Sequence, residues 1–383
     1  MLTQSVTSEL KQQTTDVADR LLHHCPTFLD GTEPDKSLVS AALLEFANAG
    51  LFDLGYLDPA SNGISADDMR RATIIVSALA GRSLSLATIY MVNAVFGDAF
   101  VAQIATTGQK RDLLPAIRNG TAQIAFAMTE PQAGSDAAAL GTQAKAVGQG
   151  FAISGEKIYI TGAASADHLL VVARFEGGDK RAISLFLVPT GTQGLVIKPL
   201  PRIAGNTHGS CQLFLDDVRV GPDQLLGGNE KLGKAWATLR FTGSLERIVV
   251  AATATGLAGA VVDRAIDFAK ERRQFGNTIA SFQAVQHMLV EMRTAETGMR
   301  LFVDHAVDML ASGESDIAAS MAKFHCAEQL QEIVAKGMRI MGGRACFTFE
   351  QMSRFYCEAP FSLYAGGTIE IQKALIARAM GIG

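Results

Sequence analysis

The sequence lacks the patterns typical of secreted, metal-binding and membrane proteins. Its 383 residues include only five cysteines, an odd number with no Cys-x-x-Cys pair, so neither a disulfide framework nor a zinc site is expected. The N-terminus has no basic segment followed by an apolar core. The longest apolar stretch, residues 248–262, is shorter than the roughly 20 residues of a membrane span. We expect a cytoplasmic protein with reduced thiols, no bound metal and no membrane span.

Basic residues are also scarce. The chain has 34 Lys and Arg against 38 Asp and Glu, which gives a net charge of −4. Nucleic acids and anionic membranes bind basic patches, so the charge balance argues against either partner. Hydrophobic residues make up 48% and charged residues 19%, a composition typical of a globular protein with substantial cores.

The spacing of apolar residues divides the chain into three segments. Helical spacing runs through residues 1–121 and returns in 229–383, whereas 122–228 alternate with a period of two. No Gly-x-Gly-x-x-Gly follows a strand, which argues against a parallel dinucleotide-binding sheet. The sequence therefore predicts an N-terminal helical domain, a middle antiparallel β domain (a barrel or a sandwich) and a C-terminal helical bundle.

Individual elements follow from the same spacing. We expect strands at 168–173, 183–188 and 212–215, and a strand pair around a Gly turn within 151–161. The expected helices are 9–23, 37–49, 67–100 with a break at Gly81, 111–118, 236–272, 282–311, 315–341 and 369–380.

An apolar run breaks into a polar loop of small residues within 125–136. Gly134 and Ser135 allow a backbone to approach a ligand closely, and Thr129 and Ser135 supply hydroxyl donors. From these residues alone, the stretch is either a ligand-binding turn at the mouth of a sheet or an ordinary loop.

This loop also carries a resemblance to a known family. Residues 128–136, Met-Thr-Glu-Pro-Gln-Ala-Gly-Ser-Asp, resemble the signature of the flavin-dependent acyl-CoA dehydrogenases, and the resemblance covers nearly the whole chain from about residue 40. It implies the three-part fold of that family, an FAD cofactor and an oxidoreductase acting on acyl thioesters. Four further motifs follow in the family's order, at 157–161, 272–276 with 282–284, 341–343 and 367–372.

The resemblance implies FAD contacts residue by residue. Met128 and Thr129 would touch the isoalloxazine ring, Tyr159 would lie beside it where most members have Trp, and Thr161 would donate near N5. Arg272 would bind the pyrophosphate, because its planar guanidinium matches phosphate oxygens. In the family this contact crosses to a neighbouring subunit. The other positions assigned to the cofactor are Phe126, Gly134, Ser135, Gln274, Phe275, Gln283, Arg339, Gly342, Gly343, Thr368 and Glu370.

The general base that most members carry before the Gly-Thr of the C-terminal motif is missing here. That position is Gly366, which has no side chain to take a proton. A minority of the family, similar to isovaleryl-CoA dehydrogenase, places the base on the long bundle helix before an Arg, and here Glu246 precedes Arg247. Steps of three, four, seven and eleven residues reach Val249, Val250, Thr253 and Leu257, which puts Glu246 on a mostly apolar stripe and should raise its pKa. Alternatively, Glu246 is a first-turn residue held by the helix dipole.

Other positions would serve the substrate. In the family the amide at Gly366 polarises the thioester carbonyl, an oxyanion-type contact for the enolate. Ser135 would face the thioester arm, and Ser244 and Arg247 would lie near the pantetheine arm or the acyl head. Glu130 is structural in the family, and we assign it no proton transfer.

These assignments predict FAD-dependent α,β-dehydrogenation of an acyl group carried by coenzyme A or a carrier protein. Glu246 would take the α-proton and flavin N5 the β-hydride, and an electron-transfer flavoprotein or another acceptor would reoxidise the flavin. The same motifs would serve an enoyl-thioester reductase. A flavin monooxygenase or oxidase is a further alternative, against which the retained Glu246 argues. A third alternative is a non-enzymatic flavoprotein or nucleic-acid binder of the same fold, and the absence of a basic surplus argues against it. The resemblance also implies a homodimer or homotetramer.

Overall fold

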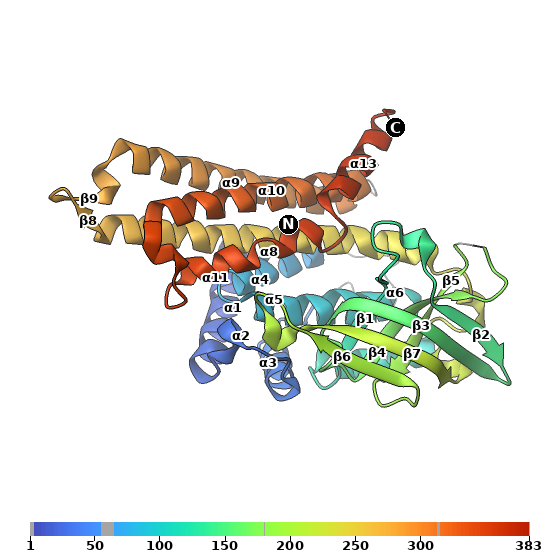
Figure 1. Cartoon of the computed structure of the whole chain (residues 1–383). Helices are drawn as coiled ribbons and strands as arrows, with labels where there is room; N and C mark the ends of the chain where they lie inside the picture. Colours follow the sequence, from blue (N-terminus) through green and yellow to red (C-terminus); the bar gives the residue numbers. More distant parts are fainter. Residues whose placement is uncertain (1–3, 55–64, 180, 312–314, 383) are drawn as a thin grey trace. The chain divides into compact units, whose positions relative to one another are not determined.

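The computed structural model describes residues 4–54, 65–179, 181–311 and 315–382 (Figure 1). They form two compact units. The bundle unit comprises Met1–Ala18, Met69–Ala87 and Ser244–Gly383, and the sheet unit comprises Asp19–Asp68 and Thr88–Gly243. The order of helices, sheet and helices along the chain confirms the predicted fold class. The division into domains at 1–121, 122–228 and 229–383 stays a prediction.

The N-terminal third of the chain is helical, as predicted. Asp35 accepts hydrogen bonds from the amides of Ser37 and Leu38 and so starts a helix, and Thr106 starts another by a capping box with Gln109. Beyond the expected break at Gly81, part of the helix takes the wider π form. The elements are α1 (Gln4–His24), α2 (Thr27–Asp30), α3 (Lys36–Asn48), α4 (Ala66–Ala80), α5 (Leu84–Met91), η2 (Val92–Ala99), α6 (Phe100–Ile104) and α7 (Thr107–Arg118).

One mixed sheet dominates the sheet unit. Its strand order is β1-β4-β2-β3-β7-β6, and β5 pairs with the other edge of β4. A core of small and apolar side chains, including Ala125, Leu169 and Phe186, lies against it. The strands are β1 (Ile124–Ala127), β2 (Gln143–Val147), β3 (Gly150–Thr161), β4 (His168–Phe175), β5 (Ile183–Pro189), β6 (Leu195–Leu200) and β7 (Ser210–Val220).

The prediction of a purely antiparallel sheet is wrong for two pairings. Both β1 and β2 run parallel to β4, sharing one of its edges in succession. The β2–β3 hairpin lies between β1 and β4 in sequence. After this hairpin the chain re-enters the sheet as β4, which lies beside β1 and runs in the same direction as β1. Period-two alternation reports which face is buried and carries no information on a neighbour's direction.

The expected Gly turn within 151–161 is also wrong. Gly155 lies inside β3, where the pairing with β7 shifts register, and it marks a bulge in a continuous strand. Its φ is +153°, and a Cβ there would lie 2.4 Å from Thr142 Oγ1. The sequence did not predict β2 and β6, because β2 buries a single residue and β6 buries none.

Helix α10 is the central element of the bundle unit, with α9, α11, α12 and α13 packed against it. Figure 1 shows the β8–β9 hairpin and α13 at opposite ends of the long helices. The elements are α8 (Trp236–Glu271), β8 (Arg273–Gln274), β9 (Asn277–Thr278), α9 (Gln283–Ala311), α10 (Ser315–Met341), α11 (Gln351–Glu358), α12 (Phe361–Tyr364) and α13 (Ile369–Ala379).

Two helical stretches, Leu84–Ile104 and Trp236–Glu271, are long and apolar enough to cross a membrane by length and composition. Their most apolar windows are 100% and 78% buried inside the protein, as in the core helices of a folded domain.

Helices α4 and α8 touch through their backbones, and from this contact we predict the effect of a substitution on stability. A Cβ on Gly256 would lie 2.0 Å from the Ser77 carbonyl oxygen, so Gly256→Ala must push the helices apart. We expect a loss of about 1–3 kcal/mol in the free energy of unfolding, measured by chemical denaturation. The control is Gly298→Ala on α9, where a Cβ meets nothing within 4 Å and Ala favours the helix. Equal stability of the two variants would contradict the prediction.

Candidate active site

Glu246 lies well inside α8, which begins at Trp236, so it is not a first-turn residue held by the helix dipole. The stripe expected on its face is present, because Val249, Val250 and Leu257 are buried. Glu246 itself is half-buried. A carboxylate therefore lies along an apolar helix face with limited access to water.

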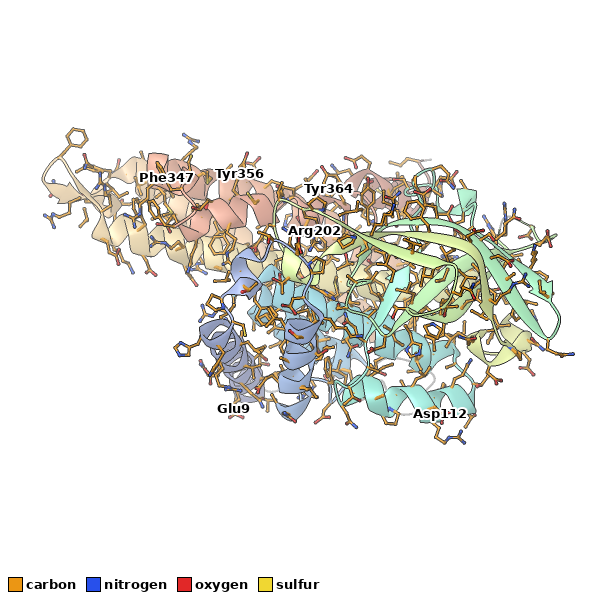
Figure 2. All side chains as sticks on the ribbon, turned by 60° about the horizontal axis from the view of Figure 1, so that its bottom comes forward. Glu9, Asp112, Arg202, Phe347, Tyr356 and Tyr364 are labelled. Atoms are coloured by element: carbon orange, nitrogen blue, oxygen red, sulfur yellow. The ribbon has the colours of Figure 1, made fainter. Side chains whose placement is uncertain are left out.

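The Glu246 side chain adjoins the loop in which the family's usual base would stand. Gly366 follows α12 with φ +69°, and its N–H faces the Glu246 carboxylate closely enough to lower the pKa of that group. A Cβ on Gly366 would lie 3.5 Å from Glu246 Cγ and 3.7 Å from its Cδ. The Glu246 carboxylate therefore lies in the small region that a side chain at position 366 would enter. Tyr364, just before this loop, is 66% exposed (Figure 2).

Burial raises the pKa of Glu246 to about 7, against the opposing charges of Arg247 and Lys323 and the Gly366 N–H, which lower it. Near neutral pH the side chain is therefore present in both protonated and ionised forms. A group balanced in this way suits proton transfer, because an efficient general base has a pKa near the working pH.

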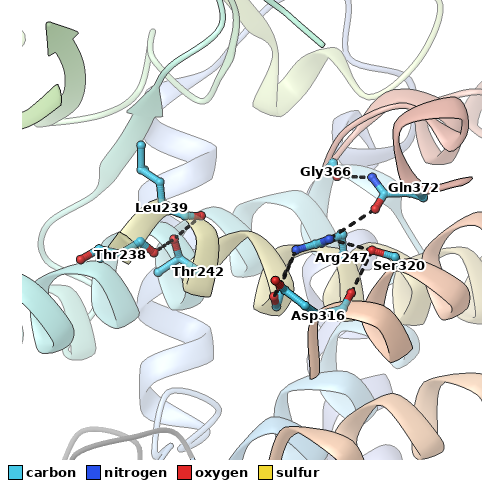
Figure 3. Close-up of polar contacts among 9 residues, drawn as sticks. Thr238, Leu239, Thr242, Arg247, Asp316, Ser320, Gly366 and Gln372 are labelled. Atoms are coloured by element: carbon cyan, nitrogen blue, oxygen red, sulfur yellow. Dashed lines mark hydrogen bonds and ion pairs between the residues drawn. The ribbon is translucent and has the colours of Figure 1, made fainter. Parts of the chain in front are cut away.

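Arg247, the residue after Glu246 on α8, joins three helices through its hydrogen bonds (Figure 3). Its Nη1 donates to Ser320 Oγ at 2.7 Å and to Gln372 Oε1 at 3.5 Å. Its Nη2 donates to Ser244 Oγ and Asp316 Oδ1, both at 3.1 Å, and Ser244 also donates to Asp316. These bonds fix α8 to α10 and α13. The substrate contacts expected of Arg247 and Ser244 stay predictions.

Several residues of this region were not predicted from the sequence. Gln372 Nε2 donates to the carbonyls of Gly366 and Gly367 at 3.1 and 3.3 Å and so shapes the loop. Lys323 on α10 has no exposed surface and donates to the Leu363 carbonyl at 3.0 Å. The signal in the sequence was a polar stripe on a buried helix: Asp316, Ser320 and Lys323 recur at helical spacing.

The sheet unit brings the first two cofactor motifs together. Lys157 Nζ donates to the Met128 carbonyl at 3.0 Å, and the Ile158 amide donates to the Thr129 carbonyl at 2.9 Å. Lys157 also forms a fully buried ion pair with Glu130 at 2.7 Å. Glu130 in turn accepts from the amides of Gly141 and Thr142. This pattern supports the structural role expected of Glu130.

The residues that the resemblance assigns to the flavin in these motifs lie partly or fully exposed, and their contacts with it stay predictions. Tyr159 is 67% exposed and has φ +60°, an uncommon conformation for a non-glycine residue that often accompanies a functional site. Gly134 and Ser135 are exposed, and a Cβ on Gly134 would meet nothing within 4 Å. Thr161 is half-buried, with its hydroxyl 3.3 Å from that of Ser210.

Phe126 is placed differently from the other residues of this group. Its ring stacks on Phe96 and Phe100, with centroids 4.9 and 5.0 Å apart, in the apolar core of the sheet unit. Its flavin contact stays a prediction.

The remaining cofactor positions divide between the two ends of the bundle unit. Thr368 caps α13 through the Ile371 amide, and Glu370 is exposed beside it, in the region of Glu246. Phe275, 91% exposed with φ +50°, lies in the hairpin after α8. The other positions assigned at that far end are Arg272, Gln274, Gln283, Arg339, Gly342 and Gly343.

Among the described residues, no group of three or more His, Cys, Asp or Glu side chains is arranged to hold a metal ion.

Family models match both parts of the chain that hold these residues. The acyl-CoA dehydrogenase middle-domain model matches residues 125–218, and the acyl-CoA dehydrogenase C-terminal-domain model matches residues 236–381. The chain belongs to the acyl-CoA dehydrogenase family. As members of this family do, it acts as an oxidoreductase on CH–CH bonds with FAD as cofactor, which confirms these predictions.

Curated relatives include both reductases and dehydrogenases. The 3-(aryl)acrylate reductase of Clostridium sporogenes is 34% identical over 82% of this chain and 83% of its own length. The caffeyl-CoA reductase-Etf complex subunit CarC of Acetobacterium woodii is 30% identical over 91% of each chain. The mitochondrial long-chain specific acyl-CoA dehydrogenase of Sus scrofa is 32% identical over 73% of this chain and 65% of its own length.

Solved structures agree with the fold. An acyl-CoA dehydrogenase from Geobacillus kaustophilus superposes with a TM-score of 0.89, with 26% identity, over 99% of this chain and 98% of the other.

Proposed function

We propose that this acyl-CoA dehydrogenase family member catalyses α,β-dehydrogenation of an acyl thioester, with Glu246 as the base for the α-proton. The observation that carries the proposal is the Glu246 carboxylate against Gly366, with an N–H donor and two cations around it. FAD, when bound, supplies the acceptor for the β-hydride. The chain's own part is to take the α-proton and to keep the carboxylate aimed at it.

The loop at Gly366 has a defined part in this chemistry. Its N–H stabilises the ionised form of Glu246, because a hydrogen bond to a carboxylate favours the charged state. The absence of a side chain at 366 leaves room beside the carboxylate for an acyl group. The family resemblance implies that this amide polarises the thioester carbonyl. For that, the Gly366 N–H would have to turn from the Glu246 carboxylate to the thioester carbonyl oxygen.

Anaerobic mixing of the purified yellow protein with a panel of acyl-CoA thioesters tests the proposal. We expect the flavin absorption to bleach with at least one member of the panel, and the ranking of the rates gives the preferred acyl group. A protein that holds FAD but bleaches with no saturated thioester would contradict the proposed direction. A protein that takes up no FAD would contradict the function altogether.

The pH dependence of bleaching is a separate prediction. A base must be ionised to act, and burial raises the pKa of Glu246 to about 7. The rate constant at saturating thioester should therefore rise with pH through about 7 and level off above it. Stopped-flow absorbance between about pH 5.5 and 8.5 measures this rise of the rate constant on the acid side of the pH profile. A rate that is flat across the range would show that no group with this pKa takes the proton.

A second candidate function is the reverse reaction, reduction of an enoyl thioester. Two of the relatives carry reductase names, and one of them belongs to an Etf complex. In that direction protonated Glu246 would donate to Cα, which its pKa of about 7 also permits. Chemically reduced protein mixed with enoyl thioesters, aryl-acrylyl thioesters among them, should regain its flavin absorption. A reoxidation rate far above the forward bleaching rate at matched concentrations favours the reductase.

The proposed substrate carrier is coenzyme A, and the proposed electron partner is an electron-transfer flavoprotein. The family and the Etf complex of one relative support both.

We further propose that the FAD site is completed by a second copy of the chain. Glu246 lies on α8, and Arg272 is the first residue after this helix. The two residues are 26 positions apart, which at a rise of 1.5 Å per residue corresponds to roughly 39 Å. One dinucleotide does not span from a ring near Glu246 to a phosphate at Arg272 of the same chain. The exposed hairpin with Phe275 therefore serves a neighbour.

Mixed subunits test this shared site. Arg272→Ala should weaken FAD binding about 10–100-fold, the loss of a charge-assisted hydrogen bond. Co-expression of this variant with Glu246→Gln should restore activity, because one site of each hybrid keeps both residues. An activity no higher than the sum of the two separate variants would mean that Arg272 and Glu246 of one chain serve the same site, against a site shared between chains.

A further inference from the structure

Lys323 is a buried cation to which the proposed function assigns no role of its own. It lies on α10 with no exposed surface, on the helix face that also carries Asp316 and Ser320. The described residues give its ammonium one hydrogen bond, to the Leu363 carbonyl at 3.0 Å. A buried ammonium group needs a compensating negative charge, and a single neutral carbonyl does not provide one.

The main compensating charge is the Glu246 carboxylate, since Glu370 attracts Lys323 less strongly than Glu246 does. Each of the two groups acts on the other electrostatically, and the attraction favours the charged form of both. Arg247, the other cation near Glu246, bonds to Asp316, Ser320 and Gln372. Both cations act on Glu246, Arg247 the more strongly, and Lys323 has one hydrogen bond among the described residues, to the loop that leads to Gly366.

We infer that Lys323 is a positioning residue for proton transfer, which keeps Glu246 ionised and anchors the loop that presents the Gly366 N–H. This inference rests on the proposed function of Glu246 as the base. The anchoring follows from the Leu363 contact, since Leu363 lies three residues before Gly366. The Lys323 ammonium group thus favours the ionised state of Glu246 and also holds the loop whose Gly366 N–H faces the Glu246 carboxylate.

The charged groups around the pair come from three helices. Glu246 and Arg247 lie on α8, Lys323 and Asp316 on α10, and Glu370 on α13. Burial lowers the pKa of Lys323 to about 8, with Glu246 and Glu370 acting to raise it and Arg247 acting to lower it. Lys323 is therefore charged at neutral pH and loses its charge above about pH 8, so its support for the carboxylate fades in alkaline solution.

Two variants separate the charge from the hydrogen bond. Lys323→Gln retains a donor for the Leu363 carbonyl but lacks the charge, and Lys323→Met lacks both. Met also guards against a folding failure of the Gln variant, since its side chain is close to Lys in length and Glu246, with a pKa of about 7, can take up a proton when the cation is lost. Lys323→Arg retains the charge.

The measurement is an infrared titration of the Glu246 carboxyl band in the FAD-loaded protein, isolated as the difference from Glu246→Gln. We expect the midpoint to rise by about 1–3 pH units in both uncharged variants, the effect of removing a neighbouring opposite charge. The acid limb of flavin bleaching should move with it, and Lys323→Arg should stay close to the parent. A merely structural Lys323 would change stability and leave the midpoint in place.

An unchanged midpoint in both Lys323→Gln and Lys323→Met would overturn the inference. The infrared readout does not depend on turnover, so failures of the two proposals differ. If the midpoint moves but Glu246→Gln bleaches at the parent rate, the electrostatic pair stands and the base is elsewhere. If Glu246→Gln blocks bleaching while the midpoint stays, Glu246 is the base and Lys323 does not tune it.

Discussion

Replacement of Glu246 by Gln is expected to slow anaerobic flavin bleaching by about 10²–10⁴-fold, the contribution of a general base. The substitution preserves shape and hydrogen-bonding length but removes the group that accepts the proton. FAD content should be unchanged, because the carboxylate contacts the Gly366 loop and the cations of the bundle unit. Stopped-flow absorbance under anaerobic conditions, with the best thioester of the panel, measures the effect.

Glu328→Gln is the matched control. Glu328 lies on α10 of the same bundle unit, but it is partly exposed and pairs with Lys373. Its loss should leave the bleaching rate within a factor of about two, since exposed ion pairs contribute little. If the two Gln variants bleach alike, proton removal does not depend on Glu246. Glu246 then does not replace the base that is missing at position 366.

Replacement of Lys157 by Met is expected to cause the largest loss of stability among these predictions. Lys157 and Glu130 are both fully buried, and burial lowers the pKa of Lys157 to about 8 against the attraction of Glu130. Removing one partner leaves a buried carboxylate without its cation, which costs about 3–5 kcal/mol. The Met128 carbonyl also loses its donor, so the FAD loop should loosen and release cofactor. Urea denaturation and FAD release on dilution measure the two effects.

A double variant distinguishes lost pairing from lost packing. Glu130→Gln with Lys157→Met removes both charges, and the single side-chain oxygen introduced at position 130 can still accept from one of the two backbone amides, of Gly141 or Thr142, that donate to the two oxygens of Glu130. This double variant should recover a substantial part of the stability lost in Lys157→Met, because coupled groups are not additive. Lys145→Met on the exposed face of β2 serves as the control. A Lys157→Met protein as stable as the parent would mean that the pair does not hold the loop.

The sequence predicted the elements that depend on local pattern. Helix α10 was expected at 315–341 and runs from Ser315 to Met341, because its apolar residues recur with helical spacing over many turns. Glu246 could be singled out in the same way, since its stripe lies on one helix. The family motifs located Thr129 and Tyr159 next to each other in advance, and the bond between Ile158 and Thr129 joins those two segments.

Features that depend on distant contacts were not predictable from one chain. The parallel pairing of β1 with β4 is set by the order in which the chain returns, which no local pattern records. The closeness of Glu246 to Gly366 arises only when α13 and its loop pack on the bundle. The polar stripe of Asp316, Ser320 and Lys323 could be seen in the sequence, but such a stripe is usually solvated, and only the folded protein shows Lys323 without exposed surface.

Hydrogen exchange at the α-carbon of the substrate tests the role of Glu246 most directly, because it requires proton removal and no net transfer of electrons. A saturated acyl thioester would be incubated with the oxidised protein in D2O and its α-position followed by mass spectrometry. The parent protein should catalyse exchange, and Glu246→Gln should reduce the exchange rate by about 10²-fold or more. Exchange by Glu246→Gln at the parent rate would contradict the assignment of Glu246 as the base.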